Sequence, residues 1–219
     1  MHNVTVAFAA LLVMLLSYFF GCFNGSFMVS HFIIRDDVRK HGSCNAGLTN
    51  FYRTYGAKYA LLVIACDMGK TVAACLLGSF FFRCLGWDGT LGTLLAGLGC
   101  ELGHIFPVFY GFRGGKGILS GGTLVLLLNW RVAAVAWALF LLLWLTTRYV
   151  SLASITATCS APITVYFVYG HNWLYTGLCL AVAALVVWCH RENIQRLLHG
   201  TEKKFKWHVN PTEGKEPPK

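Results

Sequence analysis

The stretch V-T-V-A-F-A-A-L-L-V-M-L-L-S-Y-F-F-G-C-F, residues 4–23, contains no charged side chain. As a helix rising 1.5 Å per residue it would reach about 30 Å, the thickness of the hydrocarbon core of a bilayer. No basic residue precedes it, and no small-residue cleavage site follows it before Gly25. These features are typical of a retained transmembrane helix rather than of a cleaved signal peptide.

The composition of the whole chain also indicates a membrane protein. Of the 219 residues 56% are hydrophobic and only 12% are charged, about half the charge of an average soluble domain. The apolar runs predict an all-α integral membrane protein with seven transmembrane helices. Two of the runs are short for a crossing and could instead form one re-entrant hairpin. The six runs after the first are residues 59–82, 89–110, 117–130, 132–147, 152–169 and 173–189.

The basic residues predict the orientation of these helices. Of the 18 lysines and arginines, Arg83 and Arg131 fall on one side, Lys70 lies inside a run, and all others fall on the opposite side. The positive-inside rule therefore predicts an N-terminus outside and a C-terminus in the cytoplasm. The net charge of +9 is explained by orientation and by anionic lipid, and we expect no nucleic acid partner. We expect one integral-membrane domain, residues 1–203, and a basic, flexible cytoplasmic tail, residues 204–219.

The nine cysteines do not predict a metal or redox site. Most of them lie in apolar runs, and the chain has no C-x-x-C pair. They are better interpreted as small hydrophobic residues. We found no set of side chains with the spacing of metal ligands.

The longest loop, residues 35–53, combines glycine with short polar side chains. It contains G-S-C-N-A-G at residues 42–47, followed by Thr49, Asn50 and Arg53. Backbone N–H groups, hydroxyls and a guanidinium together can cradle a phosphate. An ordinary polar turn between two helices would have the same composition, so this loop alone does not decide between the two. Its candidate phosphate ligands are Ser43, Asn45, Asn50 and Arg53.

A second loop, residues 103–117, predicts an anion site more strongly. Gly114 and Gly115 come directly before Lys116, and a helix is expected to begin at about Gly117. A glycine turn, a lysine and a helix N-terminus bind anions through geometry and dipole together. The spacing of a Walker loop is absent.

Two shorter stretches place polar residues on the same predicted side. Ser151 follows Arg148 in a short turn, and His190 and Asn193 share a helix face where the last apolar run ends. Together the four stretches predict an anion-binding site at the cytoplasmic ends of several helices.

Four polar residues fall inside apolar runs: Asp67, Lys70, Glu101 and His104. Such residues are functional candidates by default. Here a structural role is favoured, because Asp67 and Lys70 are three residues apart and can neutralise each other. Glu101 would be a further partner for Lys70.

The four stretches resemble the motifs of a known enzyme family. H-G-S-C-N-A-G-L-T-N-F-Y-R, G-H-I-F-P-V-F-Y-G-F-R-G-G-K-G, R-Y-V-S-L-A-S-I and H-R-E-N-I-Q-R-L-L-H-G resemble, in order and spacing, those of the bacterial acyl-phosphate:glycerol-3-phosphate acyltransferases of the PlsY type. The resemblance runs from about residue 25 to residue 202. Cys44 and Leu48 stand where the family usually has glycine and alanine.

The resemblance implies a reaction, a location and a set of site residues. A fatty acyl group would pass from acyl phosphate to the 1-hydroxyl of glycerol 3-phosphate, giving lysophosphatidic acid and phosphate, the first acylation of phospholipid synthesis. No cofactor is implied, and the enzyme would lie in the bacterial inner membrane among lipids, with its active site on the cytoplasmic face. Lys116, His190 and Asn193 would be catalytic. Phosphate would be bound by these three with Ser43, Asn45, Asn50, Arg53, Gly114, Gly115 and Ser151.

Several points stay open at this stage. The proton of the attacking hydroxyl could pass to His190 or to a substrate phosphate. A transporter of an organic phosphate would also need cationic loops, although such proteins generally bind their substrate near the midplane of the bilayer and have repeated halves. Acyl-chain preference and oligomeric state are not predicted. The pair Gly99 and Gly103 would permit close helix packing within one chain or between two.

Overall fold

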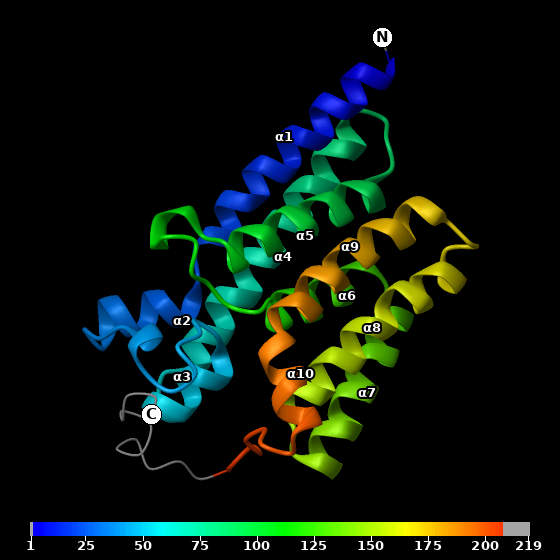
Figure 1. Ribbon diagram of the computed structural model, residues 1–219. Helices are drawn as coiled ribbons and strands as arrows, with labels where there is room; N and C mark the ends of the chain where they lie inside the picture. The colour runs from blue at the N-terminus through cyan, green and yellow to red at the C-terminus, as the bar shows by residue number, and fades with distance from the viewer. Residues whose placement is uncertain (1, 208–219) are drawn as a thin grey trace.

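The computed structural model describes residues 2–207, and its regular structure is entirely helical (Figure 1). The long helices are α1 (His2–Cys22), α4 (Ala60–Cys84), α5 (Gly89–Ile105), α7 (Trp130–Thr147), α8 (Val150–Val168) and α9 (Trp173–Cys189). Between and after them lie the short helices α2 (Gly25–Met28), α3 (Leu48–Tyr55), α6 (Ile118–Leu128) and α10 (Arg191–Leu198). Single turns are formed by η1 (Val29–Ile33), η2 (Val38–Lys40) and η3 (Val108–Tyr110).

Five helical segments are long and apolar enough to cross a bilayer within residues 2–207. They are Val4–Ile33, Ala60–Cys84, Gly89–Tyr110, Trp130–Thr147 and Val150–Val168. Helices α9 and α10 add a sixth if the two, bent by 59°, form one broken span. Helix α6 has 11 residues and reaches only about half of the core by itself. The membrane-protein prediction is therefore confirmed, and the expected seventh crossing depends on this short helix.

Helix α5 is the centre of the molecule. It is the most buried of the five segments and packs against α1 and α4 on one side and α6 and α9 on the other. Its glycines let α1 approach closely: a Cβ on Gly99 would lie 2.3 Å from the Met14 carbonyl oxygen, and one on Gly103 would lie 1.9 Å from that of Tyr18. The glycine pair is thus used for packing within the chain.

The second half of the chain forms another helix group. Helices α7, α8 and α9 pack on one another around buried residues that include Val132, Val165 and Cys179. The N-terminal end of α1 lies at the opposite end of the molecule from α2, α3 and α10 (Figure 1). All four polar stretches of the sequence therefore gather at the end that carries the short helices.

Two details differ from the sequence prediction. The loop of residues 35–53 is partly helical, because α3 begins at Leu48 and buries Asn50, Phe51 and Thr54 while its other face stays polar. The packed part of the chain also extends past residue 203: the Phe205 ring lies 5.4 Å from that of Tyr52 and 5.3 Å from that of Trp144. Most of the predicted flexible tail, residues 208–219, lies outside the described residues.

Candidate active site

The glycine turn places Lys116 at the start of α6. The amides of Gly114 and Gly115 donate to the carbonyls of Ile105 and His104, both at 3.1 Å, and so fold the turn back on the end of α5. Gly117 caps α6 with φ of +81°, a backbone conformation that favours glycine. A Cβ on Gly114 would lie 2.0 Å from the His104 carbonyl oxygen, so no side chain fits there. The helix start predicted at about residue 117 is confirmed.

The ammonium of Lys116 reaches across to α10. It donates a hydrogen bond to the side-chain oxygen of Asn193, in the first turn of α10. Burial lowers the pKa of Lys116, and the nearby Arg196 guanidinium lowers it further. This is the environment of a cation that would gain from an arriving anion.

Glu202 joins three site side chains, and sequence analysis missed it. Its carboxylate accepts hydrogen bonds from Ser151 Oγ at 2.7 Å, Asn193 Nδ2 at 2.8 Å and Arg196 Nε at 2.7 Å. Burial by itself would raise the pKa of Glu202, but these hydrogen bonds outweigh it and lower the pKa. The available signal was a lone acidic residue within the basic stretch that follows α10.

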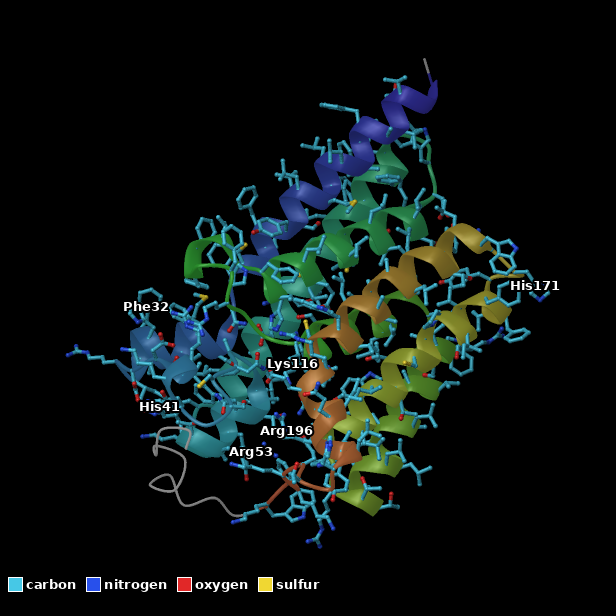
Figure 2. The ribbon with its side chains drawn as sticks, in the orientation of Figure 1. Phe32, His41, Arg53, Lys116, His171 and Arg196 are labelled. Carbon is cyan, nitrogen blue, oxygen red and sulfur yellow. The ribbon has the colours of Figure 1, made fainter. Side chains whose placement is uncertain are left out.

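Two guanidiniums belong to the same cluster. Figure 2 shows Arg53 and Arg196 toward the end of the molecule that carries α3 and α10, with Lys116 nearer the middle. Arg53, on α3, donates to the carbonyl of Lys203 at 3.1 Å, next to Glu202. Burial lowers the pKa of Arg53, and Arg196 acts in the same direction while Glu202 opposes them. Arginine remains charged in proteins, so the cluster offers a planar donor as well as an ammonium.

The first loop is organised by Asn50. Its Nδ2 donates to the carbonyls of Val38 and His41 at 3.1 Å and of Asn45 at 3.0 Å, and its Oδ1 accepts from the Ser43 amide at 2.9 Å. These contacts use the side chain's hydrogen-bonding capacity, so Asn50 holds the loop in shape. The Ser43 side chain is exposed and Asn45 is half-buried.

Cys44 adopts a left-handed backbone conformation, with φ of +54°. It follows Gly42, which is also left-handed with φ of +57°. The position where the family usually has glycine is therefore one at which a Cβ is strained.

The first loop and the glycine turn touch directly. The Ala46 amide donates to the Gly114 carbonyl at 3.3 Å. The structure thus brings Lys116, Ser151, Asn193 and Arg53 to one end of the helices through Glu202 and its neighbours. Ser43 and Asn45 are attached to that group through the Ala46–Gly114 contact.

His190 is the residue at which α9 bends into α10. Its side chain is buried, and its Nδ1 lies 2.8 Å from the Val186 carbonyl oxygen. A carbonyl only accepts, so Nδ1 carries the proton and Nε2 keeps a free lone pair. Burial lowers the pKa of His190 to about 4, with the charge of Lys116 contributing. The imidazole is therefore neutral at pH 7.

The intramembrane polar residues depart from expectation at one point. Lys70 Nζ lies 2.8 Å from Asp67 Oδ1, which confirms that this pair neutralises itself. The prediction that Glu101 is a further partner of Lys70 is wrong. Among residues 2–207 the Glu101 carboxylate has no hydrogen-bond partner, and it lies against Gly117 and Gly121 at the start of α6.

The model of one protein family matches residues 11–200 of the chain, that of glycerol-3-phosphate acyltransferase. The chain belongs to the glycerol-3-phosphate acyltransferase family. A member from Syntrophomonas wolfei is 39% identical over 197 residues, covering 90% of this chain and 96% of that one. A member from Alkaliphilus metalliredigens is 40% identical over 195 residues, 89% and 95% of the two chains.

Solved structures of this acyltransferase family match the fold as well. The crystal structure of PlsY (YgiH), an integral membrane glycerol 3-phosphate acyltransferase, in its glycerol 3-phosphate form superimposes with a TM-score of 0.79 at 36% identity, covering 90% of this chain and 96% of that one. Its lysophosphatidic acid form gives a TM-score of 0.77 at 35% identity, with 90% and 95% covered. The resemblance found in the four motifs is confirmed.

Proposed function

We propose that this protein transfers a fatty acyl group from acyl phosphate to the 1-hydroxyl of glycerol 3-phosphate, giving lysophosphatidic acid and inorganic phosphate. One observation carries the proposal: the contact between Lys116 and Asn193 joins the glycine turn to the cluster of Ser151, Arg196 and Glu202. Both substrates and both products of this reaction carry a phosphate group, and this cluster offers an ammonium, guanidiniums and a helix N-terminus for it.

The reaction needs positioning and charge stabilisation more than it needs a strong nucleophile. The hydroxyl oxygen attacks the acyl carbonyl carbon, a C–O ester bond forms, and the bond from that carbon to the phosphate oxygen breaks. Negative charge develops first on the carbonyl oxygen and then on the departing phosphate. Lys116 and the free amides at the start of α6 are suited to stabilise it.

The hydroxyl proton is best assigned to a substrate phosphate. A base works most efficiently when its pKa is near the working pH. A phosphate monoester has a second pKa of about 6, whereas burial lowers the pKa of His190 to about 4. The attacking hydroxyl has only one proton to donate, so His190 would orient the glycerol by accepting at Nε2 a hydrogen bond from its other hydroxyl.

We propose further that the chain crosses the bacterial inner membrane seven times. The N-terminus would be outside, and the active site and C-terminus would be cytoplasmic. The asymmetry of the basic residues supports this orientation. The gathering of the site residues at the end opposite the N-terminal end of α1 supports it too. The lysophosphatidic acid product would pass into the surrounding membrane lipids.

The test is acyl transfer by the purified protein. Protein in lipid receives palmitoyl phosphate and labelled glycerol 3-phosphate with a chelator present, beside a Lys116→Ala variant. Labelled lysophosphatidic acid from the parent alone would support the donor and the site. If folded protein made no product from acyl phosphate but carried glycerol 3-phosphate into vesicles, the proposal of acyl transfer would be rejected in favour of transport.

A further inference from the structure

A buried polar cluster lies beneath the two substrate-binding loops, within the helix bundle. It consists of Asp67 and Lys70 on α4 and His104 on α5, whose side chains are no more than 4% exposed. Lys70 Nζ lies 2.8 Å from Asp67 Oδ1 and 2.8 Å from His104 Nδ1. Removing such charges from water is costly, and a hydrophobic core of the same shape is often as stable. Structural stability alone is therefore a weak explanation for the cluster.

One arm of this cluster fixes the junction between α1 and α2. Lys70 Nζ donates to the carbonyls of Gly21 and Phe23, both at 3.1 Å, and Asp67 Oδ1 accepts from the Gly25 amide at 3.0 Å. Asn24, inside that junction, donates from Nδ2 to the Ala46 carbonyl at 2.9 Å. Ala46 in turn donates its amide to the Gly114 carbonyl. The pair is thus connected to the first loop and to the glycine turn.

The second arm reaches the glycine turn from α5. An ammonium cannot accept, so His104 Nδ1 accepts from Lys70, and the ring's proton is on Nε2. That atom faces Gly115: a Cβ there would lie 2.1 Å from Nε2 and 2.9 Å from the Ala46 carbonyl oxygen. The His104 backbone carbonyl also accepts the Gly115 amide at 3.1 Å. One residue therefore supports the turn with both its ring and its backbone.

Glu101 supports the same turn one helical turn earlier. A Cβ on Gly117 would lie 2.1 Å from Glu101 Oε2. Two side chains of α5, three residues apart, thus contact Gly115 and Gly117, the residues on either side of Lys116. Glu101 and His104 therefore set the position of Lys116 through their contacts with Gly117 and Gly115.

We propose that His104, held by the buried Asp67–Lys70 pair, is a positioning residue that places Lys116 and sets its register with the first loop. The cluster does not touch the phosphates itself. It acts through the glycine turn on one side and through the α1–α2 junction on the other. This inference rests on the proposed function, since it assigns Lys116 to the substrate phosphate.

The test compares the loss caused by His104→Ala in two backgrounds, the natural chain and a Lys116→Arg variant. The Lys116→Arg variant keeps a positive charge but changes its placement. We expect His104→Ala to lower kcat/KM for glycerol 3-phosphate at least tenfold in the natural chain and less than threefold in the Lys116→Arg variant. In that variant the charge is already displaced, so the loss of His104 can displace it little further. We expect His104→Asn, whose amide oxygen can accept from Lys70 but which lacks the Nε2 that faces Gly115, to recover only part of the activity.

Equal losses in the two backgrounds, or no loss in the natural chain, would overturn the proposal. A purely structural role would give equal losses. Thr93→Val serves as the matched control, because Thr93 is buried in the same helix and its hydroxyl donates to the Gly89 carbonyl of that helix. If His104→Ala does not yield folded protein, Gly115→Ala addresses the same contact from the turn and is compared in the same two backgrounds.

A separate measurement distinguishes this inference from the choice of acyl donor. Glycerol 3-phosphate binding should raise the apparent unfolding temperature of the protein, and this rise can be measured without an acyl donor. If acyl phosphate proves not to be the donor, the same variants are compared by this rise. We expect it to shrink with His104→Ala in the natural chain and to change little in the Lys116→Arg background, and equal shrinkage in both would reject the positioning role.

Discussion

The ammonium of Lys116 donates a hydrogen bond to the side-chain oxygen of Asn193, although 77 residues separate the two in sequence. Asn193 passes the connection on, because its Nδ2 donates to Glu202. The ammonium that the glycine turn positions is thereby held in place by α10, the last helix within residues 2–207.

Replacing Lys116 by alanine should lower kcat/KM for acyl transfer about 10²–10³-fold, the range found when one donor to a developing oxyanion is removed. The protein should keep its fold, because Asn193 loses only one of its partners. Arg131→Ala is the control, since Arg131 is exposed and lies over the Trp130 ring, away from the site residues. Equal effects of the two substitutions would contradict the assignment of Lys116.

Replacing Glu202 by glutamine should destabilise the protein by about 2–3 kcal/mol, because three donors lose a charged acceptor. The pKa of Glu202 is lowered in the folded state. Its contribution is therefore present above the unfolded pKa of about 4.3 and lost as pH falls through the lower folded value. We expect the apparent unfolding midpoints of the two proteins to differ at pH 7 and to converge on acidification. A difference that stays constant with pH would exclude this role.

Replacing Cys44 by glycine should raise stability by up to about 1 kcal/mol, because the left-handed conformation costs a residue with a Cβ about that much. Some of the gain is offset by the greater freedom of glycine in the unfolded chain. Thermal unfolding of Cys44→Gly and Cys44→Ser separates the backbone from the thiol. Serine keeps the Cβ, and an equal gain with serine would assign the effect to the thiol.

Replacing His190 by glutamine should lower activity about tenfold and leave the acid limb of the rate profile near pH 6. The limb would then belong to the phosphate of glycerol 3-phosphate, whose second pKa is about 6, rather than to an imidazole whose pKa burial lowers to about 4. The measurement is kcat/KM against pH for both proteins. Disappearance of the limb in the variant would identify His190 as the base instead.

The sequence was sufficient for features that depend on local chemistry. A charge-free apolar run predicts α1, and glycines beside a lysine predict the turn that precedes α6, because in both cases the signal lies within one segment. The helix α3 was missed, since Gly42–Gly47 and the polar residues that follow have the composition of a loop, while Asn50 and Phe51 are buried only through tertiary contacts.

Glu202 and Glu101 could not be placed from sequence for a similar reason. An acidic residue in a basic stretch is ordinarily solvated, and the partners of Glu202 come from α8 and α10. Glu101 is three residues from His104 and shares its helix face, yet only the path of the glycine turn decides that it meets Gly117 rather than Lys70. Contacts between distant segments are set by packing, which periodicity does not encode.

The place of Glu202 near the end of the chain has a consequence for how the protein is made. Helices α1 to α10 all precede it in the sequence, so its hydrogen bonds to Ser151, Asn193 and Arg196 can form only after those helices have been synthesised. The ring contacts of Phe205 and the hydrogen bond from Tyr52 to the Trp207 carbonyl form later still. The contacts that join α3, α8 and α10 around Glu202 are therefore completed only after the long helices of the chain have been synthesised.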